Sequence, residues 1–519
     1  MGVTSEERDL RARIEGGTPP SSDVSALVEQ LRVENAALRT IIEELLHRIY
    51  HKKSERVTPA VRPAPPAAPK TRTKPAADET GHGRAPFRDD LPRETIVTDV
   101  PEEQRVCTTC AAALLPIGVD VSEQGDLQPV RIIVRRYERK KYACPQGHEV
   151  QSGAAPPPGL VARAKWTTNT YAFVVVAKFG DHLPLDRVES MLQRQGIELP
   201  KSTMADMAAL VAERIVPILA ECKKEILAHD HLQADETPLK TVLDGGRGTA
   251  QGYLWVYRAL CPQDRGQAPI EKLLMKFSFS RGHEVPLAFL AGWQGTLQTD
   301  GYQGYDQVVR TNGLRHAGCW SHARRKWKKA LDLGVKDAEV MIDLLRRLWQ
   351  IEAAVKTRIA AKKLDHVAAE EIRRRVRNRR SNSAVARIRK ELDRIRAAPG
   401  LLPKSPLGKA ATYLHNQWAE LLVFLDDPQV ELDTNAIERA IRPIAIGRRN
   451  WHVAGSPQGA ETAAALFSII GMCKALDIDP HAYLADVLER VSPYADLAAL
   501  TPWAWARARA AGATITLAS

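Results

Sequence analysis

Residues 231–300 contain the pattern that most restricts how this chain can fold. Three runs rich in β-branched and aromatic residues, HLQADETPL (231–239), YLWVYRAL (253–260) and KLLMKFSFS (272–280), are separated by turn residues. This spacing predicts a three-strand meander. A helical stretch, EVPLAFLAGW (284–293), follows, and then a short strand that ends in QTDGYQGY.

Three strands, a helix and a further strand are the order of a ribonuclease H-like fold. In such a core, Asp235 in the first strand and Asp300 at the end of the last would lie on neighbouring strands. A third acid, Glu438, occurs much later in NAIERAIRP. There Asn435, Glu438 and Arg442 are spaced i, i+3 and i+7, which predicts a shared helix face.

Three carboxylates from separate elements are suited to hard divalent cations, because Mg²⁺ and Mn²⁺ favour oxygen ligands and leave room for substrate phosphates. Two such ions roughly 3.5 to 4 Å apart can clamp the attacking and leaving oxygens of a displacement at phosphorus. We expect Asp235 to bridge both ions, Asp300 to hold one and Glu438 the other. Taken singly, each acid has a simpler interpretation as a solvated turn or cap residue, or, for Glu438, as an ordinary i, i+4 partner of Arg442.

Several longer strings accompany these acids. They are RIYHKKSER (48–56), GCWSHARRKW (318–327), LPKSPLGKAATYLHNQW (402–418), RPIAIGRRNWHVAGS (442–456) and IDPHAYLADVLERV (478–491). With the three acidic motifs, they make the chain resemble transposases of the insertion sequence 66 family, a branch of the DDE transposases.

The resemblance implies a metal-dependent enzyme that cuts DNA at the terminal inverted repeats of its own mobile element and joins the cut ends to target DNA. It implies Asp235, Asp300 and Glu438 as the catalytic residues, with two Mg²⁺ or Mn²⁺ ions as cofactors. Whether other proteins encoded by the element act with it stays open.

Composition agrees with a DNA-binding role. The chain carries 74 Lys and Arg against 62 Asp and Glu, a net charge of +12 that suits a polyanionic partner. Its seven cysteines do not form a disulfide framework, and the charged N-terminus has no signal-peptide core. No apolar run is long enough to span a bilayer. We therefore expect a cytoplasmic protein without a membrane partner.

A heptad pattern marks residues 22–55 as a coiled-coil helix. Its seam consists of Val24, Val28, Leu31, Asn35, Leu38, Ile42, Leu45 and Ile49. β-branched residues opposite leucines favour two parallel strands, and one buried asparagine fixes their register. We therefore expect a homodimer, since two element ends must be brought together, although the same stripe could pack against its own chain.

Residues 56–90 are a Pro- and Ala-rich linker. A small module follows over residues 91–155, with zinc ligands predicted at Cys107, Cys110, Cys144 and His148. Related transposases close this ribbon with a second Cys-x-x-Cys, whereas here Gly147 stands where the fourth cysteine is expected, so His148 either substitutes or the metal is lost. Arg131, Arg135, Arg136 and Lys140 give the module a basic face for phosphate contacts.

The rest of the chain divides by pattern. We expect a helical domain at 160–230, either a helix-turn-helix or simple packing on the core; a catalytic core at 231–330 and 431–460; a helical insertion at 331–430; and a C-terminal helical region at 461–519. In the insertion, residues 373–396 carry 11 basic and two acidic side chains, which suggests that DNA passes along it. Further DNA contacts are predicted at Arg325 and Lys326, after an expected strand end at Trp320, and at Arg442, Arg448 and Arg449.

The sequence thus predicts a multidomain α+β protein whose ribonuclease H-like α/β core follows a coiled coil and a zinc-ribbon-like module. Two rival functions remain. A nuclease or resolvase of the same fold would hydrolyse DNA without joining strands. A non-catalytic DNA-binding regulator would lack one of the acids, and none is missing.

Overall fold

The computed structural model describes residues 141–143, 150–152, 159–161, 165–246, 248–261 and 269–510. The predicted coiled coil, the linker and most of the module at 91–155 lie outside these residues. The chain divides into two compact units, one of which spans Lys53–Pro157. In that unit, β1 (Lys141–Ala143) pairs with β2 (Val150–Ser152) in an antiparallel ladder.

The second unit is built around a five-stranded mixed sheet. Its strands are β3 (His231–Val242), β4 (Thr249–Cys261), β5 (Ile270–Ser278), β6 (Thr296–Gln298) and β7 (Arg315–Ala317). They lie in the order β5-β4-β3-β6-β7. The first three are antiparallel, as the meander predicts, while β6 runs parallel to both β3 and β7.

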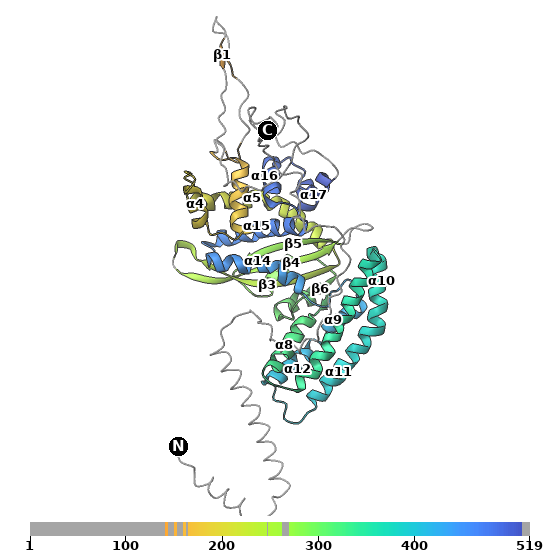
Figure 1. Cartoon of the computed structure of the whole chain (residues 1–519). Coiled ribbons are helices and arrows are strands. Elements are labelled where there is room, and N and C mark those ends of the chain that lie inside the picture. Colours follow the sequence, from red (N-terminus) through yellow and green to blue (C-terminus); the bar gives the residue numbers. More distant parts are fainter. Residues whose placement is uncertain are drawn as a thin grey trace, which may run out of the picture. The chain divides into compact units, whose positions relative to one another are not determined.

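Both faces of this sheet are covered, because side chains of β4 alternate between two apolar clusters. Leu254 and Val256 join one cluster, and Trp255 and Tyr257 join the other. The first face packs against α5 (Lys201–Leu227), α14 (Asn435–Trp451) and α15 (Pro457–Ala475), the last two shown in blue in Figure 1. The second face packs against α6 (Glu284–Phe289) and α7 (Asp306–Asn312).

Further helices pack around the first face. They are α3 (Thr168–Val175), η2 (Val176–Gly180), α4 (Leu185–Gln193), α16 (Pro480–Arg490) and α17 (Pro502–Ala510). Apolar residues of α3, α5, α15 and α16 form one continuous core with this face of the sheet. No described helix is long and apolar enough to cross a membrane.

A bundle of helices lies between β7 and α14 in sequence. It comprises α8 (Trp320–Asp332), α9 (Asp337–Ala361), α10 (His366–Val376), η5 (Arg377–Ser381), α11 (Asn382–Arg396), α12 (Pro406–Asn416) and α13 (Trp418–Asp426). Of these, α8, α9, α11, α12 and α13 share an apolar core of their own that contains Trp320 and Trp327. The expectation of a strand end at Trp320 is wrong: β7 ends at Ala317, and Trp320 begins α8, where its indole is buried.

The bundle contains one ion pair that is almost fully buried. Arg377 donates to both carboxylate oxygens of Glu352, at 2.9 and 3.0 Å, and their side chains are 2% and 10% exposed. Arg377 also donates to the carbonyl oxygens of Phe424 and Asp427. This guanidinium therefore joins α9 and η5 to the segment that leads towards α14.

Candidate active site

Asp235 lies in the middle of β3, on the face of the sheet that packs against α14. Leu239, four residues further along the strand, points to the same face as Asp235 and shares a core cluster with Ile437 of α14. Burial raises the pKa of the Asp235 carboxyl to about 8, and the negative charges of Asp300, Glu236 and Glu438 act in the same direction. Asp235 is therefore a half-buried acid within the electrostatic reach of three others.

Asp300 lies in the turn that follows β6, the parallel neighbour of β3. Its Oδ1 accepts a hydrogen bond from the Tyr302 amide at 2.9 Å, and its carbonyl oxygen accepts one from the Tyr413 hydroxyl at 2.7 Å. Gly301 has a φ of +87°, and a Cβ there would lie 2.6 Å from Oε1 of Gln417. The positive φ favours a glycine after Asp300, and any larger residue there would also require the end of the Gln417 side chain to shift.

Glu438 reaches these aspartates because α14 lies against β3. Ile437 is fully buried in the core of the first sheet face, and Ile441 packs at its edge, as their helical spacing predicts. Arg448 donates to the Thr237 hydroxyl of β3 at 2.9 Å and to the Pro238 carbonyl. Beyond the helix, the Ala454 amide donates to the Lys240 carbonyl of β3, and its carbonyl accepts from the Val242 amide.

The segment that enters α14 is held by buried polar groups. Gln233 of β3 donates to Gln298 of β6 at 2.9 Å and accepts from Arg258 at 2.9 Å. Arg258 and Gln233 both reach the carboxylate of Glu431, and Gln298 donates to the Glu431 carbonyl at 2.7 Å. Thr434 bonds to the Cys319 thiol. These contacts fix the start of α14 beside the strands that carry the aspartates.

Two cationic or titratable side chains of α8 contact Glu438. Arg325 donates to its carboxylate oxygens at 3.1 and 3.3 Å, and Nε2 of His322 lies 3.5 Å from Oε1. Burial, together with the charge of Arg325, lowers the pKa of His322, which favours a neutral imidazole at pH 7. Glu438 thus pairs with a residue 113 positions earlier rather than with Arg442 on its own helix.

The donor chemistry of this site fits a divalent cation. Asp235, Asp300 and Glu438 offer only hard oxygen ligands. The raised pKa of Asp235 shows that burial and neighbouring carboxylates disfavour its negative charge, and a cation would offset this penalty. In the described parts of the chain, no group of three or more His, Cys, Asp or Glu side chains is already arranged to hold a metal ion. The acids would therefore need to rearrange on binding, with Glu438 leaving Arg325.

A second acid next to Asp235 escaped the sequence reasoning. Glu236 points to the opposite face of β3, and its side chain is only 3% exposed. Arg281 donates to its Oε1 at 3.0 Å and 2.6 Å, and the Tyr305 hydroxyl donates to its Oε2 at 3.1 Å. Tyr302 in turn stacks under the Arg281 guanidinium at 4.1 Å. The only signal in the sequence was that Glu236 and Tyr305 belong to the ADETP and QTDGYQGY strings.

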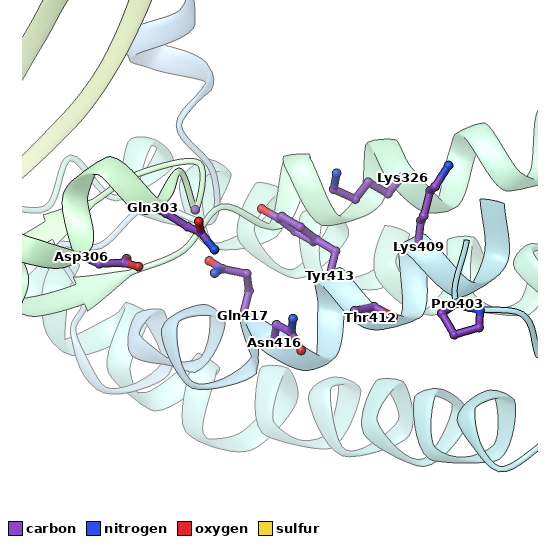
Figure 2. Close-up of a pocket in the computed structure, with 10 residues that line it drawn as sticks. Gln303, Asp306, Lys326, Pro403, Lys409, Thr412, Tyr413, Asn416 and Gln417 are labelled. Atoms are coloured by element: carbon purple, nitrogen blue, oxygen red, sulfur yellow. The ribbon is translucent and has the colours of Figure 1, made fainter. Parts of the chain in front are cut away.

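A pocket of about 420 Å³ opens beside Asp300. Figure 2 shows its lining, which comes from the turn after Asp300, from α8 and from the segment 403–417 that includes α12. Lys326, predicted to contact DNA, projects into this region from α8, with its ammonium 4.6 Å from the ring centroid of Tyr413. Lys326 is thus part of the lining of a pocket next to Asp300.

The other predicted contact residues have different surroundings. Arg442 and Arg449 are exposed on α14. Arg448 is half-buried and engaged with β3, so its contact with DNA stays a prediction. Several predicted residues lie outside the described residues: Cys107, Cys110, Cys144, His148, Arg131, Arg135, Arg136 and Lys140.

Comparison with known proteins places these residues in a family. A family model described as "Transposase IS66 family" matches residues 163–462, which include all three acids. A second, the "zinc-finger binding domain of transposase IS66", matches residues 104–146, and a third, the "IS66 C-terminal element", matches residues 468–503.

Three uncharacterised proteins of Sinorhizobium fredii are similar along most of their length. Protein y4hP is 32% identical over 84% of this chain and 79% of its own length. Protein y4jD is 32% identical over 80% of each chain, and y4qI is 30% identical over 79% of this chain and 75% of its own.

Proposed function

Because the chain belongs to the IS66 family of transposases, we propose that it binds the ends of its insertion sequence, cuts DNA strands there and transfers them to target DNA. The observation that carries this proposal is the half-buried carboxyl of Asp235, whose negative charge is disfavoured by loss of solvent and by Asp300 and Glu438 from two other elements. Such a cluster of acids suits metal-assisted phosphoryl transfer better than a structural role.

In this proposal, Asp235, Asp300 and Glu438 are the catalytic residues and would hold Mg²⁺ or Mn²⁺. When bound, two such ions supply positive charge to the attacking and leaving oxygens of the phosphodiester. The protein's own contribution is to hold three oxygen donors on β3, after β6 and on α14. The polar contacts of Glu431 and Thr434 support that arrangement by fixing where α14 begins.

The strand order supports a ribonuclease H-like core. Three antiparallel strands followed by two parallel ones, in the order β5-β4-β3-β6-β7, place β3 and β6 side by side. Asp235 and Asp300 belong to these central neighbours. We assign the core to 231–330 and 431–460 and the helical insertion to 331–430, with the helical domain at 160–230 before them and the helical region at 461–519 after them.

Exposed cations near the acids are the proposed DNA contacts within the described residues. Arg325, Lys326, Arg442 and Arg449 are all exposed. Arg325 is the nearest to the acids, and its guanidinium could exchange Glu438 for a DNA phosphate, since both offer paired anionic oxygens. This exchange would free the carboxylate for a metal ion while the strand is drawn in.

We further propose one structural zinc ion in the module at 91–155. The matched zinc-finger model spans Cys107, Cys110 and Cys144, and ends two residues before His148. The basic residues of the same module, Arg131, Arg135, Arg136 and Lys140, would then contact phosphates of the element ends.

The coiled-coil pattern at 22–55 supports a homodimer that pairs two element ends. A cytoplasmic location suits an enzyme that acts on cellular DNA, and it agrees with four buried free thiols, at Cys222, Cys261, Cys319 and Cys473.

Strand-transfer assays with the full-length protein test this proposal. Labelled duplexes that carry the ends of the element would be incubated with a supercoiled target plasmid, with Mg²⁺, Mn²⁺ or excess chelator. We expect cleavage at the ends and covalent joining to the plasmid, both abolished by chelation. Cleavage without joining would indicate a nuclease or resolvase, and binding without cleavage would indicate a regulator.

A further inference from the structure

The pocket beside Asp300 has the composition of a binding site rather than of a packing defect. Its lining residues are Gly301, Gln303, Asp306, Lys326, Pro403, Lys409, Thr412, Tyr413, Asn416 and Gln417. Most of them are polar, and they come from three elements that are far apart in sequence. Its volume of about 420 Å³ lies within the ~300–1,000 Å³ usual for small-ligand sites.

The charge of the pocket favours an anion. Lys326 and Lys409 are exposed, and neither forms a salt bridge with another described residue. Asp306 is the one acid in the lining. Figure 2 shows the two lysines on neighbouring helices, α8 and α12. Two unpaired ammonium groups at one rim can bind the phosphates of one strand.

The amide and hydroxyl groups of the lining offer a different chemistry. Oε1 of Gln417 is buried and has no hydrogen-bond partner. The carboxamides of Gln303 and Asn416 and the hydroxyl of Thr412, all on exposed residues, add further donors and acceptors to the lining. An unpartnered buried acceptor costs free energy unless a ligand or water satisfies it. Amide groups of this kind match the hydrogen-bonding edge of a nucleobase.

Two residues of the pocket lining contact Asp300, a proposed catalytic acid. Gly301 belongs to the lining and directly follows Asp300. The Tyr413 hydroxyl, from α12, donates to the Asp300 carbonyl at 2.7 Å. A nucleotide held in the pocket would therefore lie next to the part of the DNA strand that reaches Asp300.

We propose that this pocket holds one unpaired nucleotide of the DNA strand, next to the phosphodiester at Asp300. This inference rests on the function proposed above and deepens it. Lys326 and Lys409 bind the phosphates, Gln417 receives a donor of the base, and the Tyr413 ring supports the base or its sugar. A base within an intact duplex cannot reach these groups, so the site favours a strand whose base is already free or is extruded.

Binding measurements without metal test the pocket separately from catalysis. The full-length protein, without added Mg²⁺ or Mn²⁺, would be titrated against a labelled single-stranded oligonucleotide and against the same sequence fully paired. Lys326→Ala and Lys409→Ala should each lower the slope of log affinity against log salt for the single strand by about 0.7. Lys328→Ala on α8 and Lys404→Ala next to Pro403, two lysines outside the lining, should change this slope less.

Two further experiments probe Gln417 and the ring of Tyr413. Gln417→Met keeps the size of the side chain and removes its acceptor, so it should weaken binding to the single strand more than binding to the duplex. Photo-crosslinking with 5-iododeoxyuridine in the oligonucleotide should label Tyr413 in the parent protein. Labelling should fall in the double variant Lys326→Ala with Lys409→Ala.

The outcomes separate this inference from the proposed function. Equal losses for single strand and duplex, or crosslinks confined to other segments, would overturn the nucleotide pocket while DNA binding itself stands. A parent protein that binds neither form of DNA would overturn both proposals.

Discussion

The guanidinium of Arg325 donates to both carboxylate oxygens of Glu438, although the two residues are 113 positions apart. Their side chains are 60% and 32% exposed, so solvent screens the pair and its net contribution to stability is small. A metal ion could therefore replace Arg325 as the partner of Glu438, whose carboxylate we propose as a metal ligand.

Removing this partner should strengthen metal binding in the absence of DNA. Arg325→Gln takes away a positive charge beside Glu438, and we expect a several-fold tighter affinity for Mn²⁺, measured from the electron paramagnetic resonance signal of the free ion. Arg439→Gln, which removes an exposed cation from the next position of α14, is the matched control. Equal Mn²⁺ affinities for parent and Arg325→Gln would show that the pair does not compete with the metal.

The raised pKa of Asp235 predicts a particular dependence of stability on pH. An exposed aspartate has a pKa of about 3.9, whereas burial holds that of Asp235 at about 8 in the folded chain. Between these values the folded state keeps a proton that the unfolded state has lost, so this group lowers stability progressively as pH rises from about 4 to about 8.

Asp235→Asn should therefore raise the melting temperature of the metal-free protein, with a larger gain at pH 8 than at pH 5. The exposed Asp206→Asn on α5 serves as control. Calorimetric titration of the parent with Mg²⁺ near pH 7, in buffers of different ionisation enthalpy, should show proton release. If the gain did not depend on pH and no proton were released, Asp235 would be ionised in the free protein.

The ion pair of Arg377 and Glu352 should be a major support of the helical bundle. Arg377→Met leaves a buried carboxylate and two carbonyl oxygens without their donor, and we expect a loss of about 3–5 kcal/mol in the free energy of unfolding. The double variant Arg377→Met with Glu352→Leu should recover part of this loss. Denaturant unfolding measures both, and a cost below about 1 kcal/mol for the single variant would contradict the role assigned to Arg377.

Zinc content tests the module at 91–155. The purified full-length protein should carry about one zinc ion per chain by elemental analysis, because four soft or imidazole ligands complete a tetrahedral site. Replacing Cys107 and Cys110 by serine should remove it, whereas Cys261→Ser should not. Retention of zinc in His148→Ala would exclude His148 as the fourth ligand, and a folded parent without zinc would show that Gly147 marks a lost site.

The sheet was predictable because its signal is local. Alternation along 231–239 and the apolar runs that follow specify strands and turns within a few residues of each other, and β3, β4 and β5 form where they were expected. Helical spacing likewise predicted that Ile437 and Ile441 face the core.

Contacts between distant segments could not be predicted from the pattern. Nothing in ARRKW indicates that Arg325 meets Glu438, or that Lys326 borders a pocket with Tyr413. The basic run at 373–396 suggested a DNA-facing helix, yet its Arg377 is among the most buried side chains. Arg448 likewise bonds to β3, because the packing of α14 on the sheet decides which of its cations stay free.

The central claim is that Asp235, Asp300 and Glu438 act together on DNA. Its most direct test is cleavage of element-end DNA with Mg²⁺ by Asp235→Asn, Asp300→Asn and Glu438→Gln, beside the parent and Asp206→Asn. Each triad variant should still bind the ends but cleave them at least roughly a hundredfold more slowly, since even outer contacts of a metal site contribute about 10–100-fold. Parent-like cleavage by any one of the three would contradict the account.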